Sequence, residues 1–172
     1  MIVCKFGGTS VASAEQIKKV ASIVKTNPER KIVAVSAPGK RSSDDVKVTD
    51  LLIELAEAVL SNGKVEEKLQ NVVNRFKAIT EELELGEEIL QVIENDLRER
   101  IKGNRSNAVL FTDSLKAAGE DNNAKLIAAY FNTVGIPAKY VSPKEGLIVN
   151  DLPERTYALP EAYENLSKLK DE

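Results

Sequence analysis

Residues 1–36 read MIVCKFGGTSVASAEQIKKVASIVKTNPERKIVAVS, and they decide the fold class. The apolar run at 2–6 predicts a buried strand. Residues 31–36 predict a second strand that is apolar nearly throughout, as strands of parallel sheets tend to be. Between them, Ser13 and Gln16 form a capping-box pattern that predicts the start of a helix. The order strand, helix, strand predicts a right-handed parallel crossover.

The middle of the chain is predicted to be helical. Residues 37–47 (APGKRSSDDVK) are polar and predict a loop. Apolar residues then recur at three- and four-residue spacing through three segments, which is typical of amphipathic helices. The expected helices begin at about Thr49, extend over 65–83 and extend over 89–101. Three successive helices therefore interrupt the alternation of strands and helices.

The last third of the chain returns to a mixed pattern. Residues 108–118 fit either a strand or a helix, the helix fitting better, and Gly119 is expected to end that element. A strongly patterned helix should follow, and Gly135-Ile136-Pro137 should end it. Further elements are expected as strands at 138–141 and 146–150 and as a helix from Pro160, with Leu166 and Leu169 facing inward.

Composition excludes several classes of function. The chain has 172 residues and a net charge of −3, which argues against a nucleic-acid binder, and it has no apolar run of membrane-spanning length. Its single cysteine, Cys4, excludes an internal disulfide, so a reducing cytoplasm is the expected compartment. The absence of histidine excludes a Ser-His-Asp or Cys-His site and argues against zinc. No metal-binding residues are predicted.

The stretch KFGGTSV, residues 5–11, has the chemistry of a phosphate-binding loop. Its two glycines, Gly7 and Gly8, leave backbone N–H groups open to a ligand, and the following helix adds the positive end of its dipole. Lys5 adds a cation, while Thr9 and Ser10 add hydroxyl donors. Such a set suits phosphoryl transfer, whose transition state carries spread negative charge. The alternative is a plain tight turn beside a surface lysine, since neither G-x-x-x-x-G-K-[ST] nor G-x-G-x-x-G is present.

Four segments together resemble a known family. They are KFGGTSV (5–11), VAVSAPGK (33–40), VTDLL (48–52) and AAGEDNNAKLIAAYFNTVGIPAKYV (117–141). In this order they are similar to the aspartate kinases within the amino acid kinase family. The resemblance implies an α/β fold: a three-layer α/β/α sandwich with a mainly parallel sheet, of the carbamate kinase-like type, incomplete at its C-terminal side. It also implies conversion of ATP and L-aspartate to ADP and 4-phospho-L-aspartate, the first step toward lysine, threonine and methionine.

The resemblance also implies roles for single residues. Lys5 corresponds to the lysine that stabilises the transferred phosphoryl group. The residues against the ATP phosphates correspond to Gly7, Gly8, Thr9 and Ser10. Ser36 and Thr49 correspond to residues of the substrate site, and Glu120 to the glutamate that holds the substrate's α-amino group. From the residues alone, Glu120 is instead an acid at a helix start that complements the dipole. Asp121, Asn122 and Asn123 depart from the family's pattern and are candidates to replace its polar contacts.

The same resemblance sets the expected extent and partners. Residues 1–172 correspond to the amino-terminal lobe of the catalytic domain, on the amino-acid substrate side, with the rest of the nucleotide site and the regulatory ACT domains outside it. The isolated chain is therefore expected to have little or no kinase activity. ATP together with Mg²⁺, and L-aspartate, are the expected ligands, and a homo-oligomer is the expected state of the intact enzyme. The alternatives are another amino acid kinase, and a non-catalytic module for amino-acid binding or association.

Overall fold

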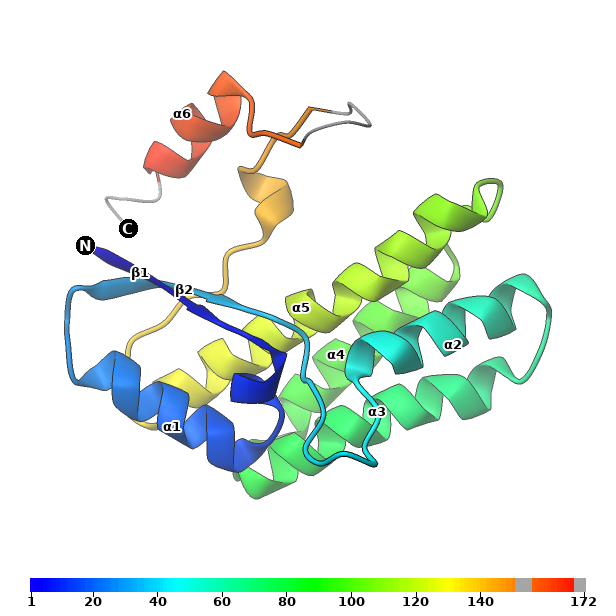
Figure 1. Ribbon diagram of the computed structural model, residues 1–172, viewed down its shortest axis with the longest axis horizontal. Helices are drawn as coiled ribbons and strands as arrows, with labels where there is room; N and C mark the ends of the chain where they lie inside the picture. Colours follow the sequence, from blue (N-terminus) through cyan, green and yellow to red (C-terminus); the bar gives the residue numbers. More distant parts are fainter. Residues whose placement is uncertain (151–155, 169–172) are drawn as a thin grey trace. The chain divides into compact units, whose positions relative to one another are not determined.

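The computed structural model describes residues 1–150 and 156–168 and divides the chain into two compact units, 1–138 and 139–172. The first unit begins with β1 (Ile2–Phe6), a short 3₁₀ turn η1 (Gly8–Val11), α1 (Ala14–Lys25) and β2 (Arg30–Val35). β1 and β2 pair in parallel, so the predicted crossover is confirmed (Figure 1). The Ser13 hydroxyl accepts a hydrogen bond from the Gln16 N–H at 3.4 Å, which is the predicted cap of α1.

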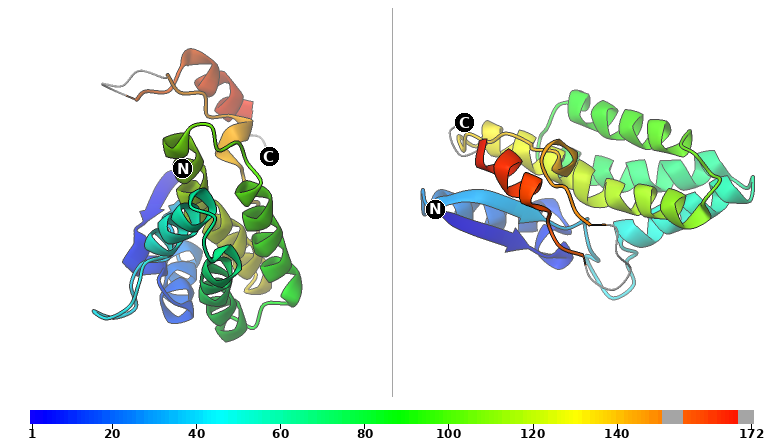
Figure 2. Two further views of the ribbon diagram at one scale, coloured as in Figure 1. Left: turned by 90° about the vertical axis from the view of Figure 1, so that its right-hand side faces the viewer. Right: turned by 90° about the horizontal axis from the view of Figure 1, so that it is seen from above.

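The helices that follow form a bundle beside this sheet. They are α2 (Val48–Leu60), α3 (Val65–Glu82), α4 (Glu87–Ile101) and α5 (Ala108–Thr133). Neighbours along the chain pack together, and α5 also packs on α2, so the four helices close into a ring (Figures 1 and 2). α5 additionally contacts β2. The three predicted helices and the polar loop at 37–47 are confirmed, each helix beginning or ending within two residues of its predicted bounds.

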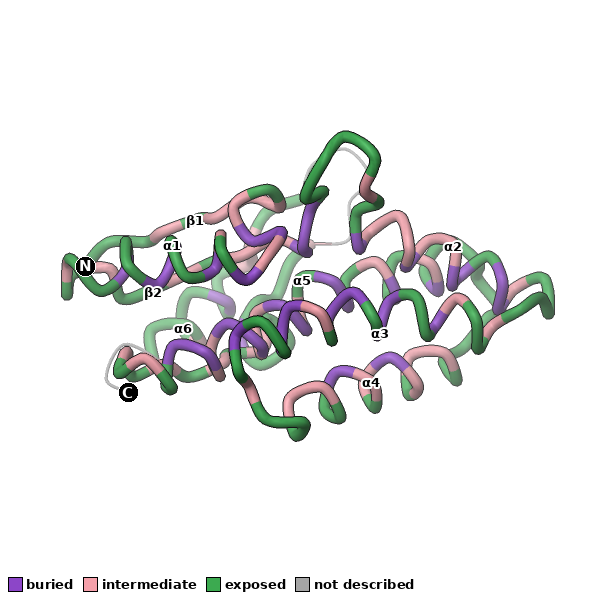
Figure 3. The backbone as a smooth tube through the Cα atoms, turned by 90° about the horizontal axis from the view of Figure 1, so that it is seen from below, coloured by how far each residue is buried: buried purple, intermediate pink, exposed green. Residues whose placement is uncertain are grey.

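The core of the first unit lies between the helices and one face of the sheet. Buried residues line the inner sides of the helices (Figure 3), and Phe6, Val33 and Val35 pack against them from the sheet. The alternate strand residues are exposed, with Val3 62% and Ile32 46% accessible. The α/β class with parallel strands is confirmed. Residues 1–138 supply two strands of the sheet and the helices that pack on one face of it, and helices dominate the structure.

α5 corrects the prediction that Gly119 ends an element. The helix runs unbroken from Ala108 to Thr133, so the segment 108–118 is helical and not a strand. Glycine costs a helix interior about 1 kcal/mol relative to alanine. Here it allows close packing, because a Cβ built on Gly119 would lie 2.7 Å from the Ala37 Cβ and 3.2 Å from the Leu52 Cδ1. Tertiary contact has therefore overridden local propensity.

The predicted strand at 138–141 is also wrong, since those residues form neither a helix nor a strand. A strand needs a partner for its backbone groups, and at Ala138 a side chain takes that place. The Asn132 Nδ2 donates to the Ala138 carbonyl at 2.8 Å, and the Ala138 N–H donates to the Asn132 Oδ1 at 3.1 Å. The amide of Asn132 thus satisfies the backbone that a neighbouring strand would otherwise satisfy.

The second unit contains η2 (Pro143–Glu145) and α6 (Pro160–Lys168). Instead of a strand at 146–150, a single antiparallel bridge joins Val149 to Ala158. The predicted helix from Pro160 is confirmed, but Leu166 is 42% exposed and does not face inward as predicted. Leu169 lies outside the described residues. Within the described parts of both units, none of the helices is long and apolar enough to span a membrane.

Candidate functional site

The first glycine loop, residues 7–12, leaves the carboxyl end of β1 and turns at once into η1. Gly7 has extended backbone angles, φ −75° and ψ 170°, and its carbonyl accepts a hydrogen bond from the Ser10 N–H at 2.9 Å. No side chain caps this turn. Thr9 is exposed, while Gly7, Gly8 and Ser10 are half-buried. The turn therefore presents backbone and hydroxyl groups at the end of the strand.

The second glycine loop, residues 36–39, leaves the neighbouring end of β2 and touches the first. The Gly39 N–H donates to the Gly8 carbonyl at 2.9 Å. A Cβ on Gly39 would lie 2.7 Å from the Gly8 carbonyl carbon and 2.9 Å from the Thr9 nitrogen, closer than real Cβ atoms come. Only a residue without a side chain allows this approach, so glycine at position 39 is required by packing. The two loops form one continuous edge, which includes Ser36.

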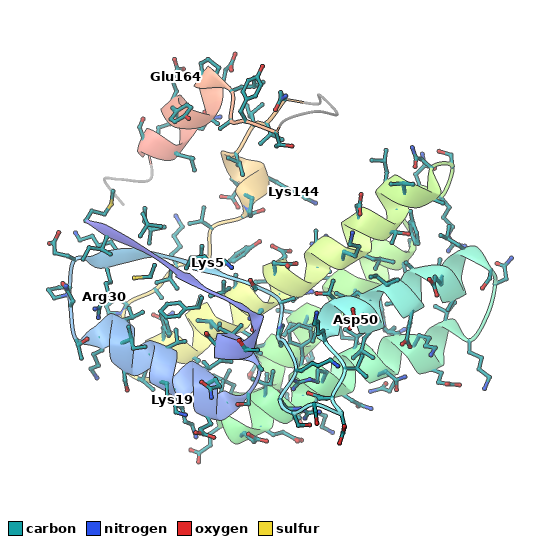
Figure 4. The ribbon with its side chains drawn as sticks, in the orientation of Figure 1. Lys5, Lys19, Arg30, Asp50, Lys144 and Glu164 are labelled. Carbon is teal, nitrogen blue, oxygen red and sulfur yellow. The ribbon has the colours of Figure 1, made fainter. Side chains whose placement is uncertain are left out.

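Lys5 stands at this edge as a free cation. It is the second-last residue of β1, is exposed, and lies on the side of the strand away from α1 (Figure 4). Within the described parts of the chain its ammonium group has neither a hydrogen bond nor an ion pair. Many of the other described basic residues are paired with carboxylates, for example Arg98 with Glu66 at 2.7 Å. Lys5 is therefore available to a ligand.

Glu120 lies in the middle of α5, thirteenth in a helix that begins at Ala108, so it is not the helix-start acid of the alternative interpretation. It is exposed, and no described residue pairs with its carboxylate. Asn123, three residues later and thus on the same face of the helix, donates from Nδ2 to the Ser36 carbonyl at 2.7 Å. Glu120 therefore stands one turn away from the contact between α5 and the second glycine loop.

Thr49 is brought to the same region by the start of α2. The Val48 N–H donates to the Pro38 carbonyl at 3.1 Å, which joins α2 to the second glycine loop. The Val48 side chain lies 3.6 Å from the position of a Cβ on Gly119, next to Glu120 in the sequence. Thr49 is half-buried in the first turn of α2. Hydrogen bonds of neighbouring residues thus connect α2 and α5 to the second glycine loop. Within the described residues, the side chains of Thr49 and Glu120 form no hydrogen bond with each other.

Asp121 and Asn122 face away from this edge, into the packing between α4 and α5. The Arg100 Nη2 donates to Asp121 at 2.7 Å, and its Nε donates to Asp96 at 2.8 Å. Asn122, fully buried, donates to Asp96 at 2.9 Å. Burial raises the pKa of Asp96, but the hydrogen bond and charge of Arg100, with help from Asn122, outweigh it and leave the pKa lowered. Of the three departures from the family pattern, Asn123 is therefore the one with a hydrogen bond to a glycine loop among the contacts described here.

Arg75 is a residue that the sequence prediction missed. It lies on α3 and contacts both loops from beneath, with its side chain only 5% exposed. The sequence did contain an indication that Arg75 is unusual. Arg75 follows Val72 by three residues and so falls on the apolar face of its helix. A charge in that position needs buried partners, and only the folded structure shows which groups these are.

The comparisons with known proteins agree with this geometry. A sequence profile of the amino acid kinase family matches residues 1–170. Aspartokinase 3 of Bacillus subtilis (strain 168) is 49% identical over 172 residues, which are 99% of this chain and 38% of that protein. Aspartokinase 1, chloroplastic, of Arabidopsis thaliana is 31% identical over 157 residues, which are 87% of this chain and 26% of that protein. The chain thus spans well under half of these curated relatives.

Solved structures show the same likeness. E. coli aspartokinase III in complex with aspartate and ADP matches with a TM-score of 0.73 and 25% identity, over 99% of this chain and 37% of that chain. Aspartate kinase of Clostridium acetobutylicum matches with a TM-score of 0.67 and 32% identity, over 76% of this chain and 29% of that chain. Because the family profile covers nearly every residue and the solved aspartokinases share the fold, this chain belongs to the amino acid kinase family.

Proposed function

We propose that this chain provides part of the active site of an aspartate kinase, which transfers the γ-phosphoryl group of ATP to L-aspartate. The observation that supports this most strongly is the edge where both parallel strands end. There, two touching glycine loops lie beside Lys5, and α5 carries Glu120 one turn from its contact with the second loop; neither side chain has a partner among the described residues. The family's aspartokinases include a structure with aspartate and ADP, which makes these two ligands the first to test.

On the phosphate side, the site needs to place positive charge and does little covalent chemistry itself. A carboxylate oxygen of the aspartate side chain attacks the γ-phosphorus, the bond from that phosphorus to the β–γ bridging oxygen breaks, and ADP leaves. The attacking carboxylate is already ionised at neutral pH, since its ordinary pKa is about 3.9. No general base is required, which suits a chain without histidine. Lys5 and the loop from Gly7 to Ser10 would stabilise the phosphoryl charge.

On the amino-acid side, Glu120 would bind the substrate's ammonium group. A pair of full charges that is also hydrogen-bonded is among the stronger contacts available to a small polar ligand. Glu120 can be held in place because its neighbours in α5 are anchored, Asn123 to the second glycine loop and Asp121 to Arg100. Ser36 and Thr49 would complete the pocket with hydroxyl groups. These roles are proposed from the family resemblance, and the hydrogen bonds that join α2 and α5 to the second glycine loop support them.

We propose that ATP binds with Mg²⁺ held largely by phosphate oxygens and water, as is usual for this ion at nucleotide sites. Among the described residues there is no group of three or more histidine, cysteine, aspartate or glutamate side chains that could hold a metal ion. A cytoplasmic homo-oligomer acting in the synthesis of lysine, threonine and methionine also belongs to the proposal.

A coupled assay of ADP release tests this function in the full-length protein. Lys5→Met should lower kcat by about 10²–10³-fold, the effect of removing one charge-stabilising donor from a transition state. Lys31→Met removes an exposed lysine from β2 and is the matched control, expected to leave turnover unchanged. Faster turnover with glutamate or carbamate than with aspartate would favour another amino acid kinase. Aspartate binding without ADP release would favour the non-catalytic module, and either result would overturn the proposal.

The expectation that residues 1–172 alone turn over slowly stays a prediction. The same assay on that polypeptide measures it, with the full-length protein at equal concentration as the reference. A rate near that of the full-length protein would contradict the expectation while leaving the proposed reaction intact.

A further inference from the structure

Arg75 joins the two glycine loops through one nitrogen atom. Its Nη2 donates to the Ala12 carbonyl at 2.7 Å, at the end of the first glycine loop, and to the Gly39 carbonyl at 3.0 Å, at the end of the second. The side chain is 5% exposed and comes from α3, a helix that contributes no other predicted residue of the site. The bridge therefore supplements the direct hydrogen bond between Gly39 and Gly8.

The polar loop, residues 40–47, supplies the counter-ion of Arg75. The Asp45 carboxylate lies 3.4 Å from the Arg75 Nη2 and accepts two hydrogen bonds from the Arg41 guanidinium, each at 2.8 Å. The hydrogen bonds of Arg41, together with the charge of Arg75, hold the pKa of Asp45 well below its usual range although burial opposes them. Asp45 therefore stays ionised across the physiological pH range.

An ion pair links the polar loop to α3. A surface hollow of about 270 Å³ lies between the loop and the helices α2 and α3, and its lining includes Arg41, Asp45 and Arg75. Beside it, the Asp45 carboxylate pairs with Arg75 and so connects the polar loop to α3.

The Nη2 group makes every hydrogen bond of the Arg75 bridge. The Nε and Nη1 groups of Arg75 are buried and have no hydrogen-bond partner among the described residues. An apolar side chain would fill the same space without leaving these donors unpaired. A buried donor without a partner costs free energy, and its presence needs a reason. The ammonium nitrogen of lysine lies one bond closer to the backbone than Nη2 of arginine, so lysine at this position would fall short of the same set of contacts.

We infer that Arg75 is a positioning residue, which sets the separation of the two glycine loops for the nucleotide phosphates and connects them to the polar loop through Asp45. The inference rests on the proposed function for its link to ATP. The effect of Arg75 on the two glycine loops, however, can be measured without any reaction. The competing view is that Arg75 only stabilises the helical bundle.

Kinetics on the full-length protein separate these two views. Arg75→Lys should raise KM for ATP by about tenfold, because one of two hydrogen bonds from a charged group is lost, and should change KM for aspartate less. Arg98→Lys is the matched control, since Arg98 is also a helical arginine paired with glutamates, but it lies on α4 away from both loops. An unchanged KM for ATP in Arg75→Lys would overturn the inference.

Hydrogen exchange supplies a readout that does not depend on activity. In Arg75→Lys, amides of residues 7–12 and 36–47 should exchange at least several-fold faster, while amides of α4 should keep their rates. Asp45→Asn keeps the guanidinium and carries the same test if Arg75→Lys fails to fold; it should accelerate residues 40–47 most. Uniform acceleration through the bundle would show a purely structural role. If instead the wild type proves to have no kinase activity, the exchange result still decides the role of Arg75.

Discussion

Gly39→Ala tests the contact on which the candidate site is built. A Cβ at this position would lie 2.7 Å from the Gly8 carbonyl carbon and 2.9 Å from its oxygen. Carbon atoms in comfortable contact are about 3.5–4.0 Å apart, so the two loops would have to separate by about 1 Å. The φ of Gly39 lies outside the left-handed range, so the expected effect is steric and not one of backbone strain.

The size of the effect follows from two costs and one gain. Overpacking against backbone that cannot rotate away costs about 1–3 kcal/mol. Separation of the loops also weakens the 2.9 Å hydrogen bond from the Gly39 N–H to the Gly8 carbonyl, which contributes about 0.5–1.5 kcal/mol. Alanine restricts the unfolded chain and returns about 0.4–1 kcal/mol. The free energy of unfolding should therefore fall by about 2 kcal/mol, taking mid-range values of these terms.

Gly7→Ala is the matched control within the same site. Its φ of −75° suits alanine, and a Cβ there would meet only the Lys5 Nζ, at 3.9 Å. We expect its stability to equal that of the wild type or to exceed it by up to about 1 kcal/mol. The two variants differ by the same single methyl group from wild type, so any difference between them reports the loop contact.

Thermal unfolding followed by far-UV circular dichroism measures the difference. For a protein of this size, 1 kcal/mol shifts Tm by about 2–4 °C, so Gly39→Ala should unfold about 4–8 °C below the wild type. It should also lose affinity for ATP, since the loops would no longer lie against each other. Equal Tm values for Gly39→Ala and Gly7→Ala would refute the reasoning, because they would show that the loops do not touch.

Three further predictions concern neighbouring elements. Gly119→Ala should lower Tm despite the helical propensity of alanine, because its methyl group would lie 2.7 Å from the Ala37 Cβ. The double variant with Ala37→Gly should recover part of the lost Tm. A higher Tm in the single variant would contradict the close packing of Gly119 against Ala37. Asp45→Asn should cost about 1–3 kcal/mol in urea unfolding at pH 7. Since folding lowers the pKa of Asp45, the stabilisation it provides is present above the unfolded pKa of about 3.9 and is lost as pH falls toward the folded value. The difference in the free energy of unfolding between Asp45→Asn and wild type should therefore shrink below pH 4. A difference that stays constant with pH would count against the ion pairs of Asp45. Glu120→Gln should raise KM for aspartate about tenfold or more by removing one charge of the pair, whereas Glu57→Gln, an exposed helical control on α2, should not; equal KM values would remove Glu120 from the substrate site.

Local patterns predicted the elements whose stability is local. The cap formed by Ser13 and Gln16, and the apolar spacing of α2, α3 and α4, specify helices without reference to distant residues. The errors occurred where one specific contact decided the outcome, between distant segments in one case and within a few residues in the other. Gly119 continues a helix because Ala37 and Leu52 pack against it. Residues 138–141 form no strand, and Asn132 satisfies the Ala138 backbone.

The residues of the candidate site also fall into two groups, those that a local pattern predicted and those whose contacts only the structure shows. Lys5 and the glycines of the first loop could be predicted because they are contiguous, and their chemistry is visible in a few letters. Asn123 could be named as a polar departure but not assigned a contact, since its partner is the carbonyl of Ser36, 87 positions earlier. Arg75 was missed because a single charge on an apolar helix face does not show which buried groups it meets.

The sequence by itself determined the phosphate-like chemistry at the end of the first strand and the positions of the helices, because each depends on residues within about two turns of one another. It also predicted the parallel crossover of β1 and β2, because a helix between two apolar strands favours that connection. Only the tertiary structure decided that two glycine loops touch, that Glu120 lies mid-helix and that Arg75 bridges both loops. These are matters of close packing between segments far apart in the chain. Packing depends on shape and distance, which no local pattern of residues records.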